Sequence, residues 1–147
     1  MKGKKIIFSI VTLLWVIVIF LFSLQPGDVS GNMSGSFLET IIRWFALDVP
    51  AEKMELCHMI LRKCAHFSEF TILGVLSSLT LLQTKISHRW LNATVFCLAV
   101  AATDETLQLF VAERAGRVAD VFIDGTGAGC GILLVLGIAW LKRKKCL

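Results

Sequence analysis

Four long apolar stretches dominate this chain and restrict the folds that it can adopt. Each is about 18 to 24 residues long, and a helix of about 20 residues spans the hydrocarbon core of a bilayer, which is about 30 Å thick. They predict an all-α, polytopic membrane protein with four transmembrane helices, in a single domain over residues 1–147. The stretches are Ile6–Leu24, Ala65–Leu82, Leu91–Val111 and Val118–Leu141.

The composition agrees with a membrane protein. Hydrophobic residues make up 56% of the chain and the mean hydropathy is +0.75, values well above those of a soluble domain. A signal peptide is the competing interpretation of the first 24 residues. We expect an uncleaved span instead, because the apolar run is long for a signal peptide and no A-x-A-like cleavage site follows it.

The charges orient the predicted spans, because short cytoplasmic loops collect Lys and Arg. Basic residues without acids precede the first span, connect the second to the third, and follow the fourth. All eleven carboxylates, from Asp28 to Asp124, then lie on the outer side. We therefore expect both termini in the cytoplasm, and we attribute the net charge of +4 to topology and attraction to anionic membrane lipids rather than to nucleic-acid binding. The basic residues are Lys2, Lys4, Lys5, Lys85, Arg89, Lys142, Arg143, Lys144 and Lys145.

The outer connection between the first two spans is expected to form an amphipathic helical cap. Pro26 and Gly27 stop the first span, and a small polar run over residues 30–36 follows. Apolar residues then recur at helical spacing from Phe37 to Phe45, which predicts a helix lying at the membrane interface with Trp44 as an anchor. A second, polar helix is expected from about Glu52 into the second span.

Three polar segments carry the candidate chemistry, and the first is at the outer end of the second span. Arg62, His66 and Glu69 are spaced i, i+4, i+7 and share one helix face. An ionisable group in a span costs a few kcal/mol, so it usually faces a protein interior or water and has a partner. The alternative to a functional site is a structural cluster in which Arg62 or His66 neutralises Glu69.

The second segment lies near the outer end of the third span. Asp104 and Gln108 share a helix face, and Glu105 is adjacent. Neighbouring carboxylates at low dielectric suit proton transfer or cation binding. The alternative is that Arg114, Arg117 or Arg62 simply pairs with them.

The third segment leads into the fourth span. Asp120 and Asp124 differ by about one helical turn and are expected to face the bundle interior. The glycines at 125, 127, 129 and 131 form two interleaved small-xxx-small pairs, which predict close helix packing rather than a phosphate-binding loop. Because all three segments lie in the outer halves of their spans, we expect them to converge on one outward-facing polar cavity.

These residues also resemble the VanZ-like family over nearly the whole chain. Two departures from the family pattern are Ala112-Glu113, where a proline–glycine commonly precedes the arginine, and Thr106-Leu107, where a histidine often precedes the glutamine. The matching motifs, in order, are Phe22-Ser-x-Gln25-Pro26-Gly27, then Arg62-Lys63-x-Ala65-His66-Phe67-x-Glu69-Phe70-x-x-Leu73-Gly74, then Asp104-Glu105-x-x-Gln108-x-Phe110, then Arg114, and finally Asp120-Val-x-x-Asp124-x-x-Gly127.

The resemblance implies a small bacterial cell-envelope protein, multi-pass in the cytoplasmic membrane. The family's namesake lowers susceptibility to teicoplanin and other lipoglycopeptide antibiotics without the D-alanyl-D-lactate route. No enzymatic activity follows from the resemblance.

Two hypotheses of different classes follow. In the first, the outer cavity binds a lipid-linked wall precursor, a lipid headgroup or a glycopeptide, with the basic groups holding phosphate or carboxylate and the others bonding sugar hydroxyls or amides. Its expected ligand-binding residues are Gln25, Arg62, Lys63, Gln108, Arg114, Asp120 and Asp124, with Glu69 and Glu105.

In the second hypothesis the protein is a membrane-embedded hydrolase or transferase acting on such a molecule. The catalytic candidates are His66, Glu69, Asp104 and Glu105, and Asp120 and Asp124 would orient groups or bind metal. Cofactor and metal stay open, with Mg²⁺ a better match to these residue types than structural zinc. A transporter is disfavoured because the inner halves of the spans are almost purely apolar. The glycines are compatible with a homo-oligomer or with packing inside one bundle.

Overall fold

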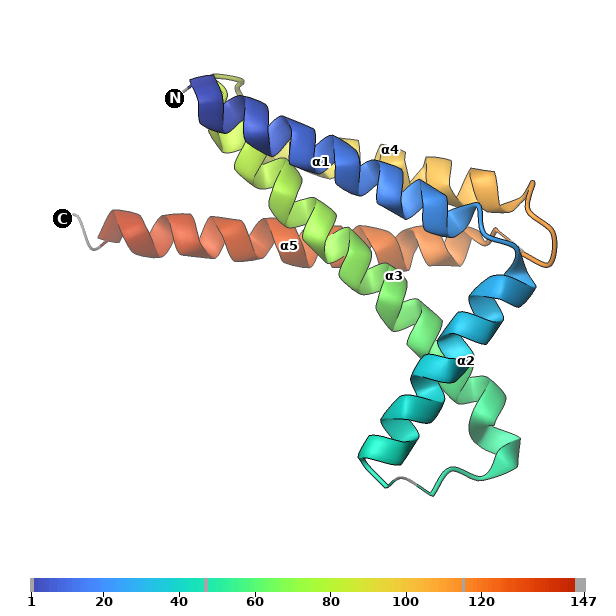
Figure 1. Ribbon diagram of the computed structural model, residues 1–147. Coiled ribbons are helices and arrows are strands. Elements are labelled where there is room, and N and C mark those ends of the chain that lie inside the picture. Colours follow the sequence, from blue (N-terminus) through green and yellow to red (C-terminus); the bar gives the residue numbers. More distant parts are fainter. Residues whose placement is uncertain (1, 47, 115, 145–147) are drawn as a thin grey trace.

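A computed structural model describes residues 2–46, 48–114 and 116–144, and every regular element in these ranges is an α-helix (Figure 1). The prediction of an all-α chain is therefore confirmed. Lys145, one of the residues used to orient the chain, lies outside the described ranges. The helices are α1 (Lys2–Ser23), α2 (Gly27–Trp44), α3 (Ala51–Leu82), α4 (Arg89–Gln108) and α5 (Val118–Lys144).

Three described helices are long and apolar enough to cross a membrane: α1 over Gly3–Ser23, and all of α3 and α5. The predicted span Leu91–Val111 corresponds to α4, which ends three residues earlier, at Gln108, and is not one of the three. Helix α4 is less apolar because it carries threonines and acids. The hydroxyls of Thr94 and Thr103 donate to carbonyl oxygens of their own helix, four residues earlier. The four-span topology therefore stays a prediction.

Helix α2 begins at Gly27, ten residues before the expected start at Phe37. The polar run over residues 30–36, which we expected to be non-helical, is helical because its hydroxyls bond inside the helix. Ser34 donates to the Gly31 carbonyl and Ser36 to the Met33 carbonyl. Asp28 in the first turn also suits the positive end of the helix dipole.

Helix α3 joins the expected polar helix and the second span into one continuous element of 32 residues. Its first half and α2 form a hairpin, here called the arm, which projects from one end of the bundle formed by the other helices (Figure 1). Trp44 and Phe45 at the end of α2 are 82% and 71% exposed. These exposed aromatic rings suit the expected anchor, although the placement of the arm at a membrane interface stays a prediction.

The core of the bundle lies where α1, α3, α4 and α5 meet. Ile19, Phe70, Leu73, Cys97 and Ala101 are buried there. The outer surface of the same helices carries many large apolar side chains, such as Leu13, Leu91 and Leu133, each more than 60% exposed. An apolar exterior around a small apolar core is expected of helices that face lipid.

Two glycines of α5 bring it unusually close to α3. A Cβ atom at Gly127 would overlap the Phe67 carbonyl oxygen, and one at Gly131 would overlap that of Thr71. Gly74 of α3 meets the Ala128 backbone in the same way. The predicted close packing is thus made by one of the two small-xxx-small pairs.

The other pair does not pack against α3. A Cβ atom at Gly125 would contact the Leu98 side chain, and Gly129 has no neighbour within 4 Å. The two pairs differ because residues 125 and 129 lie on a different face of the same helix.

The connection from α4 to α5 closes against the start of α2. The Gly27 N–H donates to the Ala112 carbonyl at 3.1 Å, and a Cβ atom at Gly27 would overlap the Glu113 backbone. Glycine is therefore required at this close approach. The contact holds the connection over the end of the bundle that carries the polar side chains.

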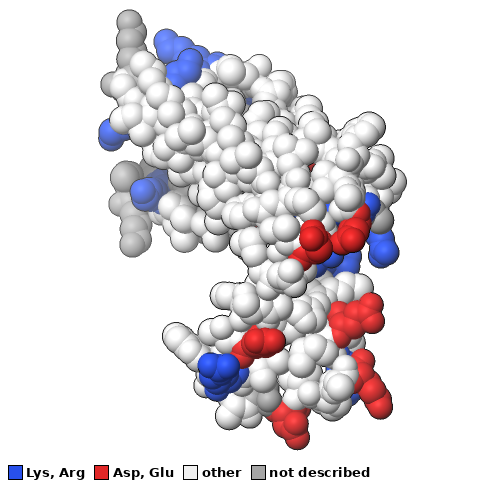
Figure 2. Space-filling view, turned by 45° about the vertical axis from the view of Figure 1, so that its right-hand side comes forward, with Lys and Arg blue, Asp and Glu red and all other residues white. Residues whose placement is uncertain are grey.

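The charge asymmetry is also spatial. The start of α1 and the end of α5 lie at the end of the bundle opposite the arm (Figure 1). Figure 2 shows Asp and Glu side chains on the arm and the adjoining end of the bundle, where Lys and Arg side chains also lie, whereas the charged side chains visible at the far end are Lys and Arg.

Candidate functional site

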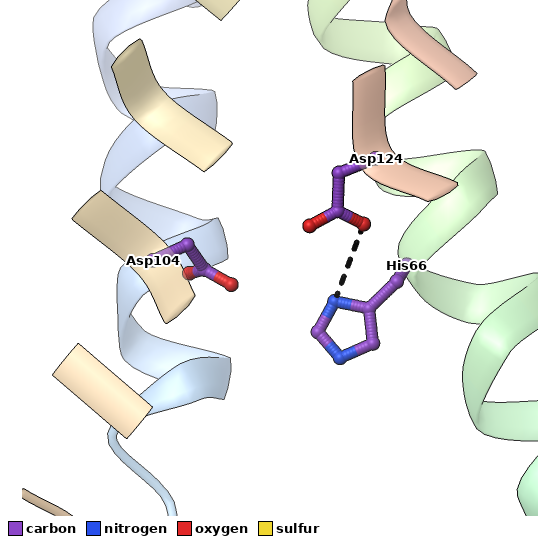
Figure 3. Close-up of side chains that lie close together, drawn as sticks. All are labelled: His66, Asp104 and Asp124. Atoms are coloured by element: carbon purple, nitrogen blue, oxygen red, sulfur yellow. Dashed lines mark ion pairs between the residues drawn. The ribbon is translucent and has the colours of Figure 1, made fainter. Parts of the chain in front are cut away.

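Side chains from three helices converge at the arm end of the bundle. His66 of α3, Asp104 of α4 and Asp124 of α5 each offer a nitrogen or oxygen atom, and these atoms lie within 4.8 Å of one another (Figure 3). His66 Nδ1 is 4.0 Å from Asp124 Oδ1 and 4.0 Å from Glu69 Oε2. The structure thus brings one residue of each predicted polar segment to a single point.

Burial is complete for the two aspartates of this cluster. Asp104 and Asp124 are both 0% exposed. His66 Nδ1, Asp104 Oδ1 and both carboxylate oxygens of Asp124 have no hydrogen-bond partner among the described residues. Burying a charge without a partner is costly, so a proton or a cation must compensate these carboxylates.

The remaining oxygen of Asp104 is held by Gln108. The Gln108 side-chain amide donates to Asp104 Oδ2 at 3.1 Å and to Ser23 Oγ at 3.3 Å, and it lies 3.4 Å from Glu105 Oε1. The predicted shared face of Asp104 and Gln108 is therefore present. Ser23 is 1% exposed and connects α1 to this network. We did not predict a role for it, although a serine in an apolar span just before a proline–glycine stop was a usable signal.

Glu105 connects the cluster to the loop between α4 and α5. Its Oε2 accepts the backbone N–H of Arg117 at 2.8 Å, so the arginine contributes its main chain and not its guanidinium. Glu105 and Asp104 thus share Gln108 as a partner, but only Glu105 also accepts a backbone hydrogen bond from Arg117.

Glu69 lies at the edge of the cluster. Its side chain is 21% exposed and faces His66, while its backbone carbonyl accepts the indole N–H of Trp15 at 2.9 Å. Of the two partners considered for Glu69 in a structural cluster, the structure places His66 near it, and no ion pair to Arg62 occurs among the described residues.

Lys63 and Asp120 form an ion pair between α3 and α5. Asp120 therefore points to Lys63 and not into the cluster, and it differs from Asp124 in this respect. The expectation that both aspartates face the bundle interior is correct for the buried Asp124, whereas Asp120 is partly exposed.

Arg62 and Arg114 are half-buried, and neither pairs with a carboxylate in the described part of the chain. One guanidinium nitrogen of Arg114 donates to the Phe22 carbonyl at 3.0 Å. Burial lowers the pKa of Arg114, which lies in the connection after α4, and the nearby Arg62 guanidinium lowers this pKa further. Two neighbouring cations without acidic partners are suited to binding an anion.

Two cavities adjoin these groups, one on each side of α3. The smaller cavity, of about 750 Å³, is lined by Gln25, Arg62, His66, Glu69 and Arg114 and by an apolar wall that includes Phe22, Met33 and Phe37. The larger cavity, of about 1050 Å³, is lined by Arg62, Lys63, His66, Gln108, Asp120 and Asp124, among others. Among the candidate residues, Asp104 and Glu105 line neither cavity.

The fold and this site define a class: a helical protein with span-like helices and a buried polar centre at one end of the bundle. Within that class, the family model described as VanZ/LLP1 matches residues 8–141, and the chain belongs to this family. No curated protein and no solved structure matches the chain.

Proposed function

We propose that this protein is a multi-pass protein of the bacterial cytoplasmic membrane that lowers susceptibility to teicoplanin-type lipoglycopeptides. In this proposal its outward-facing polar site binds the anionic headgroup of an envelope lipid or of a lipid-linked wall precursor. Membership of the VanZ/LLP1 family and three span-like helices support a membrane protein of the glycopeptide-resistance type.

The observation that carries the proposal is the mixed lining of the smaller cavity. Arg62 and Arg114 supply guanidinium groups, and Phe22, Met33 and Phe37 supply an apolar wall. Guanidinium groups match phosphate oxygens in a bidentate geometry, and the apolar wall suits the first part of a hydrocarbon chain. A lipid with an anionic headgroup would match both the guanidinium groups and the apolar wall of the smaller cavity.

The test measures surface binding of fluorescent teicoplanin to bacteria that express wild type or Arg62→Gln at equal membrane abundance. Wild type should lower the binding and raise the inhibitory concentration of teicoplanin. Arg62→Gln should lose most of this effect, because a hydrogen bond to a charged group contributes about 1.5–3 kcal/mol, or about 10- to 100-fold in affinity.

Lys53→Gln is the matched control. Lys53 is an exposed cation of the arm that lines neither cavity, so its loss should leave teicoplanin binding at the wild-type level. Equal effects of wild type and Arg62→Gln would contradict the proposed headgroup site.

A second candidate function is a membrane-embedded hydrolase or transferase that acts on the same kind of molecule. It is favoured by the unpartnered His66 and Asp124 atoms, because both residues also line the larger cavity. Purified protein distinguishes the two functions: catalysis requires that Asp124→Asn abolish turnover of a lipid-linked precursor while its affinity is kept, whereas a binding protein shows no turnover at all.

A further inference from the structure

We propose that His66, Asp104 and Asp124 bind one divalent transition-metal ion between α3, α4 and α5. The inference concerns the buried cluster, and it holds whether or not the smaller cavity binds a lipid headgroup. The sequence left the metal open and matched Mg²⁺ better than structural zinc, whereas the meeting of one imidazole with two carboxylates favours a transition-metal ion.

The geometry is the first support. The three donor atoms lie within 4.8 Å of one another and face a common point (Figure 3). Ligand bonds of about 2.1 Å place the ligand atoms of a tetrahedral ion about 3.4 Å apart. Small rotations of the three side chains would therefore bring the three donor atoms to the separation that one ion requires.

The unpartnered atoms are the second, independent support. Asp104 Oδ1 and both oxygens of the fully buried Asp124 have no partner among the described residues, and neither does His66 Nδ1. An acceptor left unsatisfied in a protein interior costs about 1–3 kcal/mol, and more when it is charged. One cation would satisfy these atoms together.

The surrounding charges do not supply this compensation. Glu69 adds a third carboxylate near His66, and Lys63 is engaged by Asp120. Arg62 and Arg114 make no ion pair with Asp104 or Asp124 in the described ranges. When its carboxylates are ionised, the cluster therefore carries an excess of negative charge that a divalent ion would balance.

Gln108 would support the metal site indirectly, by holding one of the metal-binding side chains in place. Its amide donates to Asp104 Oδ2, and the other oxygen, Oδ1, keeps no hydrogen-bond partner among the described residues. Metal-binding carboxylates are commonly oriented by such hydrogen bonds.

The donor set selects the type of ion. One imidazole and two carboxylates suit Mn²⁺, Fe²⁺ or Zn²⁺, because imidazole favours transition metals whereas Mg²⁺ and Ca²⁺ prefer oxygen-only shells. Three protein ligands leave at least one position for water or another molecule. His66 and Asp124 line the larger cavity, which supplies a route to the ion.

The test is a metal titration of the full-length protein in detergent after removal of metals with a chelator. We expect wild type to retain one Zn²⁺ or Mn²⁺ per chain after desalting, measured by elemental mass spectrometry. Because the loss of an outer-shell partner alone weakens metal binding by about 10- to 100-fold, His66→Ala and Asp124→Asn should weaken it by more than about 100-fold.

Asp120→Asn is the matched control, because it changes the same residue type one turn earlier on α5, where Lys63 is the partner. It should bind the ion as wild type does. The inference is overturned if wild type retains no ion, if it retains only Mg²⁺, or if Asp124→Asn binds Zn²⁺ and Mn²⁺ as well as wild type.

Two further measurements keep the test valid if a variant folds poorly. Added ion should raise the thermal midpoint of wild type and Asp120→Asn but not that of Asp124→Asn; an equal rise in all three would place the ion elsewhere.

In wild type, pulsed electron paramagnetic resonance of bound Mn²⁺ should show nitrogen coupling from the His66 imidazole. Absence of this coupling would contradict the proposed ligand set.

Discussion

Glu113 has a φ of 59°, in the left-handed region that favours glycine. It lies just before Arg114, at the position where the VanZ-like pattern commonly has glycine. The backbone bends here because the connection packs against Gly27, whose N–H bonds to Ala112. At a position where the family pattern commonly has glycine, this chain therefore has a residue that is strained in its backbone conformation.

A pair of substitutions at this position tests the strain. Glu113 is exposed, so truncation removes little packing. Because a Cβ atom destabilises the left-handed conformation by about 1–2 kcal/mol, Glu113→Gly should unfold at a higher temperature than Glu113→Ala, measured by thermal denaturation in detergent. Equal midpoints for the two variants would show that the φ value has no energetic consequence.

At the same scale, the surroundings differ between side chains that are adjacent in sequence or on one face. Asp104 and Glu105 are both buried, but Asp104 lies in the cluster, whereas Glu105 also accepts a hydrogen bond from the connection between α4 and α5. Asp124 is buried and Asp120 pairs with Lys63. Sequence spacing shows which residues share a face, but it does not show how deeply each one lies.

At the scale of elements, the contact between α3 and α5 sets the geometry of the site. Gly127 and Gly131 let the two backbones touch. His66 of α3 and Asp124 of α5 lie next to each other across this pair of helices. The predicted role of glycine in bringing the segments together is therefore consistent with the packing, although only one of the two glycine pairs takes part.

Two alanine substitutions on α5 test this contact. Gly131→Ala should destabilise the protein by about 1–3 kcal/mol, because the added methyl group meets the Thr71 backbone and forces the helices apart. Gly129→Ala is the control and should be neutral or stabilising by up to about 1 kcal/mol, since its Cβ atom meets nothing. Thermal midpoints in detergent compare the two, and an equal loss in both would contradict the packing argument.

At the scale of the whole molecule, the two ends of the bundle differ in charge: the carboxylates lie with the cluster at the arm end, and the opposite end carries basic residues. The basic residues near the termini mark one end, and the arm, the cavities and the buried cluster mark the other (Figures 1 and 2). With the positive-inside rule, this arrangement predicts that the site faces outward.

Cysteine labelling tests the orientation. In a background without the native cysteines, Ser36→Cys on the arm should react with a membrane-impermeant maleimide in intact cells. Ser87→Cys, between α3 and α4, should react only after the cells are opened. The reverse labelling pattern would show that the arm and the site face the cytoplasm.

The sequence determined the helical class, the boundaries of α1 and α5 to within a few residues, and the end of the bundle at which polar groups gather. It also indicated that Asp104 and Gln108 share a face, which the hydrogen bond between them shows. These features follow from local periodicity and composition, because a helix places residues at fixed angles along its own axis. Relatedness to the VanZ/LLP1 family was likewise readable from motifs.

Only the tertiary structure decided which side chains meet. The rotation and crossing of α3, α4 and α5 bring His66 to Asp104 and Asp124, and they leave Asp120 with Lys63. The part played by Ser23 also depends on a neighbour in another element, Gln108 of α4. The physical reason is that the packing of whole helix surfaces decides which side chains meet across helices. The spacing of residues within one helix does not carry this information.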